Sequence, residues 1–188
     1  MLKDEINKAL AVLKQGGLIL YPTDTIWGIG CDATNEEAVS RIFKLKGRDE
    51  SKSLIMLLDS ESKLPSYVRH VPDIAYDLIV YTEKPLTIIY SGAKNLAINA
   101  IADDGSVGIR IVKHSFCQQL IQRFRKPIVS TSANISGNPS PKTFDDIVDE
   151  IIEGVDYVVT FEQDKQSAQN PSTIMKLEED GRFTFIRK

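Results

Sequence analysis

The sequence has few of the residues that build disulfide-stapled, metal-binding or membrane-spanning proteins. Its two cysteines, Cys31 and Cys117, form no Cys-x-x-Cys pair, so we exclude a disulfide framework and expect small buried thiols. The two histidines, His70 and His114, lie in unrelated contexts, which argues against a zinc site or a Ser-His-Asp triad. No apolar run approaches the ~20 residues of a membrane helix, and residues 1–14 lack an apolar signal core. These absences predict a cytoplasmic protein with free thiols and no membrane partner.

The common phosphate-binding fingerprints are also absent, and the overall charge is of the wrong sign for a nucleic-acid module. Neither GxxxxGK[ST] nor GxGxxG occurs, so P-loop and Rossmann binding have no support. The chain carries 23 Lys and Arg against 26 Asp and Glu, a net charge of −3, whereas nucleic-acid modules are usually basic. Residues 41–52 nevertheless hold five basic and two acidic side chains. This local cationic spot suits a small anion better than a long duplex.

Helical and strand periodicities alternate along the 188 residues. One helix is expected to follow Asn35 and to end at Gly47. The expected helices cover residues 4–15, 35–47, 72–82, 114–124 and 143–153, with Asp4 and Thr143 as caps. The expected strands cover residues 18–21, 54–58, 86–90, 107–111, 127–130, 155–160, 173–177 and 182–186. This interleaving predicts one α/β (α+β) domain over residues 1–188, with a mixed sheet.

Four loops rich in small polar residues follow these elements, at the places where α/β proteins bind ligands: residues 21–30, 46–48, 130–140 and 170–173. Lys46 and Arg48 flank a glycine at a helix end. Two neighbouring cations suit a polyphosphate, although cations at a helix end also complement its dipole in solvent.

The loop that begins at Ser130 offers four hydroxyls and one carboxamide within residues 130–137. Such donors can hold phosphate or carboxylate oxygens, but the same residues can form a polar turn that satisfies its own backbone. Residues 21–30 leave the same two readings open, with Trp27 as a packing residue in the second.

Taken in order, these segments resemble the YrdC/Sua5 family of threonylcarbamoyl-AMP synthases. The matching pieces are YPTDTIWGIG (21–30), KGR (46–48), GSVGIR (105–110), STSANISG with the following PSP (130–141) and PST (171–173). The resemblance implies a twisted sheet with a cationic cavity on one face, in the single-domain form without the additional C-terminal domain of longer Sua5 proteins. The implied reaction joins L-threonine, bicarbonate and ATP into threonylcarbamoyl-AMP and pyrophosphate. That product would feed threonylcarbamoylation of adenosine 37 in tRNA by a downstream transferase.

The resemblance also implies roles for individual residues. Thr25 and Arg110 would hold threonine, with the Arg110 fork on its carboxylate, and Ser132 and Ser172 would line the same pocket. Lys46 and Arg48 would be the catalytic cations, stabilising charge as a carbamate oxygen attacks the α-phosphorus. Mg²⁺ is expected with ATP, held by phosphates and water rather than by the protein. The residues implied for ATP are Lys46, Arg48, Lys52, Ser106, Asn134 and Arg187.

Several positions depart from the family pattern. Asp49 and Ser53 stand where the family often has prolines, Trp27 replaces a tyrosine, and Leu57 stands where some members have a histidine. The intact STSAN segment favours a synthase over the related YciO-like proteins.

Two alternatives use the same features. The cationic concavity could serve an RNA-binding or ribosome-assembly module, against which the net charge argues. A carbamoyl-transfer domain of hydrogenase maturation would be similar in fold, but it is disfavoured by the two cysteines and by the short chain. The oligomeric state does not follow from the sequence.

Overall fold

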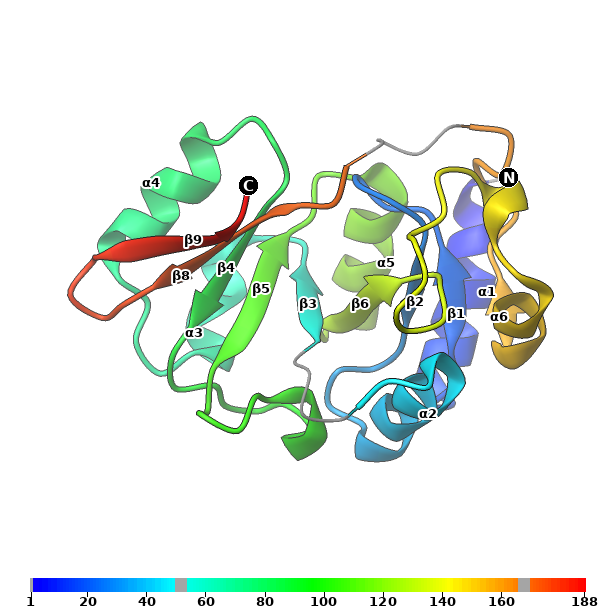
Figure 1. Cartoon of the computed structure of the whole chain (residues 1–188), viewed down its shortest axis with the longest axis horizontal. Helices are drawn as coiled ribbons and strands as arrows, with labels where there is room; N and C mark the ends of the chain where they lie inside the picture. The colour runs from blue at the N-terminus through cyan, green and yellow to red at the C-terminus, as the bar shows by residue number, and fades with distance from the viewer. Residues whose placement is uncertain (1, 50–53, 166–169) are drawn as a thin grey trace.

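The computed structural model describes residues 2–49, 54–165 and 170–188. Within these ranges the strands form one mixed sheet in the order β7-β1-β2-β6-β3-β5-β4-β8-β9 (Figure 1). The pairs β1/β7, β3/β5 and β4/β8 are parallel, and the other neighbours are antiparallel. The strands are β1 Ile19–Tyr21, β2 Gly28–Gly30, β3 Ile55–Leu58, β4 Leu86–Tyr90, β5 Val107–Ile111, β6 Ile128–Ser132, β7 Tyr157–Val158, β8 Thr173–Leu177 and β9 Phe183–Arg187.

Six α-helices and three short 3₁₀ helices connect these strands in the described part of the chain. The α-helices are α1 Leu2–Lys14, α2 Glu36–Lys46, α3 Leu64–Tyr67, α4 Asp73–Tyr81, α5 Ser115–Phe124 and α6 Asp149–Gly154. The 3₁₀ helices are η1 Glu61–Lys63, η2 Ile98–Ala100 and η3 Phe144–Asp146. Among these residues no helix is both long and apolar enough to span a bilayer.

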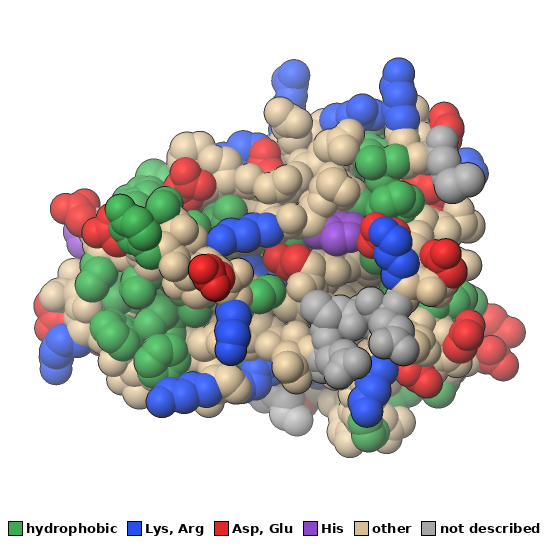
Figure 2. Space-filling view, turned by 90° about the horizontal axis from the view of Figure 1, so that it is seen from above, with side chains coloured by type: hydrophobic (Ala, Val, Ile, Leu, Met, Phe, Trp, Pro, Cys, Tyr) green, Lys and Arg blue, Asp and Glu red, His purple; other side chains and the backbone are tan. Residues whose placement is uncertain are grey.

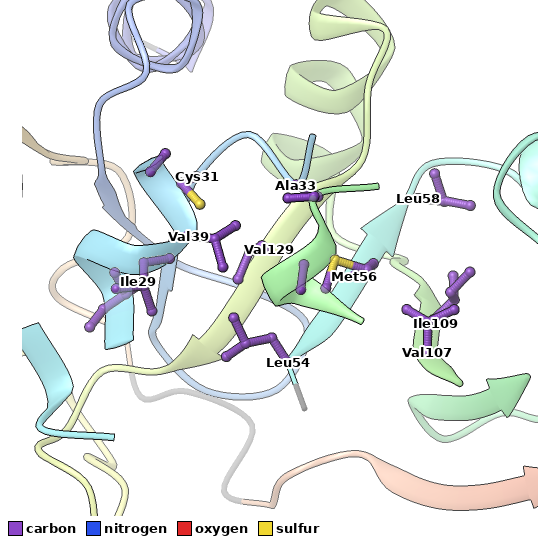
Figure 3. Packing of buried hydrophobic residues seen from close by; sticks show 14 of the residues in the cluster. Ile29, Cys31, Ala33, Val39, Leu54, Met56, Leu58, Val107, Ile109 and Val129 are labelled. Carbon is purple, nitrogen blue, oxygen red and sulfur yellow. The ribbon is translucent and has the colours of Figure 1, made fainter. Parts of the chain in front are cut away.

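The sheet separates two hydrophobic cores, because strand side chains alternate between its faces. On the first face, residues such as Met56, Ile109 and Val129 pack with Val39 of α2 (Figure 3). On the second face, α1 and α5 pack together over β1, β3 and β6, and they contribute Ile6 and Phe116. Further along this second face, alternate residues of β4 and β5 line a cavity instead of a core. The alternation therefore gives the sheet one fully packed face and one face with room for a ligand.

The expected α/β (α+β) architecture with a mixed sheet is confirmed, and most elements lie within two residues of their expected bounds. Asn35 caps α2 by accepting a hydrogen bond from the Ala38 N–H, and Gly47 ends the helix with φ 54°. Cys31 and Cys117 are free and buried, and burial raises the pKa of both thiols.

The sequence analysis did not predict strand β2. β2 was expected to be part of a loop, because its two glycines obscure the strand pattern. A Cβ at Gly30 would lie 2.7 Å from both the Tyr21 ring and the Val129 carbonyl oxygen. Glycine therefore lets β2 fit between β1 and β6. The sequence pattern could not show this, because the contacts come from neighbouring strands.

Three expected elements have different bounds in the structure. α1 begins at Leu2, two residues before the expected cap Asp4. The helix expected over 143–153 is divided into η3 and α6, because Ile147 takes an extended conformation and is buried in the larger core. The strand expected over 155–160 is limited to β7, which pairs with β1 over two residues.

Candidate functional site

A cavity of about 320 Å³ opens on the second face of the sheet, where β4, β5 and β8 are left uncovered by α1 and α5. The charged residues in its described lining are three arginines, Arg48, Arg110 and Arg187, and the described lining contains no acidic side chain. Its hydroxyl groups come from Thr25, Thr87, Ser130, Thr131, Ser132, Ser140 and Ser172. Positive charge without a carboxylate, beside many hydroxyl donors, suits an anionic ligand.

Arg110 is the most buried of the three arginines, with 4% of its surface exposed. It lies on β5, and its Nη2 is 3.2 Å from Oδ1 of Asp24. The other carboxylate oxygen of Asp24 accepts a hydrogen bond of 3.0 Å from the backbone N–H of Lys113. The Arg110 Nε has no hydrogen-bond partner among the described residues. The guanidinium is thus held from one side while a buried donor remains available to a planar anion.

Arg187 and Ser172 lie close to Arg110 in the cavity wall. Thr87, whose hydroxyl contacts that of Ser172, is paired with Arg110 across β4 and β5. The Arg187 Nε and Nη2 donate to the Ser172 carbonyl oxygen at 3.0 and 2.8 Å. The Ser172 hydroxyl lies 2.8 Å from that of Thr87, which is fully buried on β4. Burial lowers the pKa of the Arg187 guanidinium, and the positive charge of Arg110 lowers it further. The positive charges of Arg110 and Arg187 therefore act on the same region of the cavity.

Lys46 is the last residue of α2, and it is buried although it carries a charge. Its Nζ donates to the carbonyl oxygens of Ser132 and Asn134, and its own carbonyl oxygen accepts a 2.8 Å hydrogen bond from the Ser136 N–H. Burial, with the neighbouring charge of Arg48, lowers the pKa of Lys46 to about 8. Lys46 therefore fastens α2 to the 132–136 loop by both main chain and side chain.

The loop between β1 and β2 completes the cavity wall. The Thr23 hydroxyl lies 3.0 Å from that of Thr25 and donates to the Ile26 carbonyl oxygen at 2.8 Å. Trp27 is buried, and its carbonyl oxygen accepts a 3.0 Å hydrogen bond from the Ala133 N–H. Its ring meets Phe144 edge to face at 5.0 Å. This loop is packed and hydrogen-bonded, so its hydroxyls are held in place before any ligand arrives.

The structure brings six of the predicted site residues to the cavity: Thr25, Arg48, Arg110, Ser132, Ser172 and Arg187. Three others lie outside its lining. Lys46 holds the neighbouring loop, and Asn134 donates from its side-chain amide to the carbonyl oxygens of Ile135 and Asn138. Ser106 donates a hydrogen bond from its backbone N–H to the Asp104 carboxylate. Gly108, two residues after Ser106, does line the cavity. Lys52, like Ser53, lies outside the described residues.

Thr87 and Ser140 line the cavity but were not among the predicted site residues. Thr87 is a lone hydroxyl in an apolar strand, and its alternation with Ile88 placed it on the other face of the sheet. That alternation was the signal available in the sequence. Ser140 lies in a loop with no periodicity, and its position depends on tertiary packing.

No metal centre accompanies the arginines in the described part of the chain. No group of three or more His, Cys, Asp and Glu residues there could hold a metal ion. The described lining likewise contains no histidine or carboxylate able to accept a proton. The chemistry that this lining offers is the binding and orientation of negative charge.

Fold and cavity together define a class: an α/β protein whose open sheet presents an arginine-lined anion site. The chain belongs to the Sua5/YciO/YrdC family, whose model, described as "Telomere recombination", matches residues 11–188. A threonylcarbamoyl-AMP synthase of Pseudoalteromonas translucida is 33% identical over 172 residues, covering 90% of this chain and 91% of the relative. A second, from Psychromonas ingrahamii, is 38% identical over 137 residues, covering 71% and 72%.

Solved structures agree with this family. The crystal structure of P. abyssi Sua5 complexed with L-threonine superposes with a TM-score of 0.81 at 27% identity, over 92% of this chain. This chain spans 50% of the length of that Sua5. E. coli YciO superposes with a TM-score of 0.84 at 24% identity, which supports the fold alone.

Proposed function

We propose that this protein is a threonylcarbamoyl-AMP synthase, an enzyme that joins L-threonine, bicarbonate and ATP into threonylcarbamoyl-AMP and pyrophosphate. The observation that carries the proposal is the convergence of Arg48, Arg110 and Arg187 on one cavity free of acidic lining among its described residues. The reaction requires a site for one carboxylate and three phosphates at once, and three arginines supply that charge. Family membership and the names of the relatives support the same conclusion.

Threonine is assigned to the Arg110 side of the cavity. Arg110 receives the amino-acid carboxylate, because its guanidinium is fixed by Asp24 and retains a free buried Nε donor among the described residues. Thr25, Ser132 and Ser172 surround the rest of the amino acid through hydroxyl or backbone contacts. The Sua5 complex with L-threonine supports an amino-acid site on this fold.

ATP is assigned to the Arg48 and Arg187 side, where both guanidinium groups line the cavity. Lys46 adds positive charge beside Arg48 while it holds the 132–136 loop through Ser132 and Asn134. Asn134 and Ser106 act on the nucleotide indirectly. They position the cavity-lining residues of the 132–136 loop and of β5. Lys52 is the remaining residue that we assign to the phosphates of ATP, because the family resemblance of its segment implies that role. Bound Mg²⁺ would neutralise phosphate charge, and phosphate oxygens and water would hold it, because the described lining offers no carboxylate.

The chemistry of this cavity is orientation and charge stabilisation. The threonine amine attacks the carbon of bicarbonate, water leaves, and a carbamate forms. One carbamate oxygen then attacks the α-phosphorus of ATP, the bond to the β-phosphate oxygen breaks, and pyrophosphate leaves. Arg48 and Lys46 stabilise the negative charge that grows on the phosphates during this step. The downstream use of the product is tRNA modification by a separate transferase in the cytoplasm.

A pyrophosphate-release assay tests the proposal. Purified protein is given ATP and Mg²⁺ in four mixtures, which contain L-threonine, L-serine, glycine or no amino acid, and each mixture is run with and without bicarbonate. The proposal predicts release that depends on both L-threonine and bicarbonate. Equal release in all four mixtures, or none in any, would overturn it. Tight RNA binding with a steep salt dependence and no ATP turnover would instead support an RNA-binding module.

A further inference from the structure

The two edges of the sheet differ in a way that the enzymatic site does not explain. At one edge β7 is two residues long and half-buried, which leaves little backbone for another strand to pair with. At the other edge β9 is five residues long, pairs with β8 on one side, and is exposed at every residue. Within the described residues no other strand pairs with β9. Long exposed edges usually carry a proline or an inward charge that prevents pairing. β9 has no proline, and its one charged residue, Arg187, stands at its end, where it is directed into the cavity and donates to the Ser172 carbonyl oxygen.

The exposed side chains of β9 are apolar on the side of the sheet that faces α4. The register places Phe183 opposite Leu177 and Phe185 opposite Met175, both of which are buried in the larger core. The two phenylalanines remain 47% and 44% exposed, and their rings meet at 5.8 Å. Figure 2 shows hydrophobic side chains gathered over the end of the molecule that carries α4 and β9. These rings extend the core to the surface, where they stay largely exposed although the Lys188 ammonium group lies 5.1 Å from the centroid of the Phe185 ring.

The charges at the two ends of β9 have opposite signs. The turn before the strand is Glu178-Glu179-Asp180-Gly181-Arg182, in which Arg182 pairs with Asp180 and the acidic residues are in excess. The other end carries Arg187 and Lys188. An antiparallel pair of identical strands places the start of one copy beside the end of the other. The acidic turn of each copy then meets the lysine of the second. The edge is therefore complementary to itself.

We propose that β9 pairs antiparallel with β9 of a second copy of this chain, with Thr184 on the two-fold axis. In this register Phe183 of each copy lies opposite Phe185 of the other, and Asp180 lies opposite Lys188. Aromatic and opposite-charge pairs across strands both stabilise a sheet. Moving the axis by one residue to Phe185 would bring Arg182 opposite Lys188, two like charges. Moving the axis to Phe183 would keep opposite charges together but would leave one aromatic pair instead of two, with Phe185 opposite Gly181. The two aromatic pairs, together with the Asp180–Lys188 pair, therefore favour Thr184 on the axis, and the two sheets become one.

Sedimentation analysis of the purified chain tests this pairing. From about 1 to about 200 µM, a range suited to interfaces of modest area, the mass should rise from 21.0 kDa toward twice that value. Phe185→Glu should remain at the monomer mass throughout. Val148→Glu changes an exposed apolar residue at α6, and it should self-associate like the unaltered chain. A monomer mass across the whole range, or association that survives Phe185→Glu, would overturn the proposal.

The register has its own test. Opposed Cα atoms on antiparallel strands are about 4.5–5.5 Å apart, within the range that a disulfide bridges. Thr184→Cys should form a cross-linked dimer on mild oxidation, and Ser66→Cys, on α3, should not. Asp180→Lys and Lys188→Asp should each weaken association, and the double variant should restore it. Equal cross-linking of the two cysteine variants, or a double variant as weak as the single ones, would contradict this register.

Discussion

The Nη2 of Arg110 lies 3.2 Å from Oδ1 of Asp24, and both side chains are largely withdrawn from solvent at the cavity. Asp24 belongs to the β1–β2 loop and Arg110 to β5, so this ion pair joins two distant parts of the chain at the proposed threonine site. A buried arginine with an available donor can orient a carboxylate only if its guanidinium plane is fixed. We therefore propose that Asp24 positions Arg110 for the carboxylate of the amino acid.

Asp24→Asn should raise the KM for L-threonine roughly tenfold, equivalent to about 1.4 kcal/mol of lost binding. The amide keeps an acceptor for the Lys113 N–H but loses the charge that orients Arg110. The KM for ATP and the kcat should change less. Asp77→Asn, an exposed carboxylate on α4, is the matched control. An unchanged threonine KM in Asp24→Asn would remove the orienting role.

Arg48→Ala should lower kcat/KM for ATP roughly a hundredfold, the scale of losing one oriented charge contact in a transition state. Arg48 lines the cavity, and burial lowers the pKa of its guanidinium, so removing it relieves a desolvation cost in the free protein. The thermal midpoint should consequently stay close to that of the unaltered protein. Lys44→Ala, exposed on the same helix, should retain activity. A fully active Arg48→Ala enzyme would refute the phosphate assignment.

Ser132→Ala should raise the KM of at least one substrate several-fold, because a cavity hydroxyl is lost while the loop keeps its anchor. The Lys46 contact to residue 132 uses the carbonyl oxygen, which the substitution leaves in place. Ser136→Ala lies in the same loop but outside the cavity lining, and it provides the comparison. Identical steady-state constants for the two variants would make the Ser132 hydroxyl structural.

Lys46 makes the stability of the fold depend on pH in a specific direction. Its pKa is lowered to about 8, whereas in the unfolded chain it returns to the ordinary lysine value of 10.5. Between these values the unfolded chain binds more protons than the folded one, so stability contributed by this group rises with pH across the window. Below pH 8 both states are protonated, and the cost of burying the charge is present in full.

Urea unfolding at pH 7.5 and 9.5 measures this effect against Lys46→Met. The unaltered protein should gain about 2 kcal/mol more than the variant over this interval. The comparison between the two proteins removes the contributions of other titrating groups that they share. The same dependence on pH in both proteins would show that Lys46 does not carry a lowered pKa.

The order of elements, the cationic segment at Lys46 and Arg48, and the hydroxyl-rich loops of the proposed site followed from local patterns. The alternation of strands and helices, the Asn35 cap and the Gly47 stop all depend on neighbours within a few residues. Arg48 was predicted from the charged segment at the end of a helix, whereas Arg110 and Arg187 were implied by the resemblance to the YrdC/Sua5 family. Local reasoning was sufficient where the physical cause is local.

The remaining features depend on contacts between distant segments. Lys46 looks like a free phosphate ligand in sequence, yet the carbonyl oxygens of the 132–136 loop surround its ammonium group. Leu57, which stands where some family members have a histidine, is fully buried in the smaller core. β2 was not predicted, because the need for glycine at position 30 comes from the Tyr21 ring and the Val129 carbonyl oxygen on neighbouring strands. No periodicity encodes these neighbours.

The most direct test of the account follows ¹³C-labelled bicarbonate into the product. The protein is incubated with ATP, Mg²⁺, L-threonine and the labelled bicarbonate, and the adenylate fraction is analysed by mass spectrometry. The account predicts one labelled carbon in a species that contains both AMP and threonine, and its loss in Arg48→Ala and Arg110→Ala. An adenylate of threonine without the label, or no adenylate at all, would contradict it.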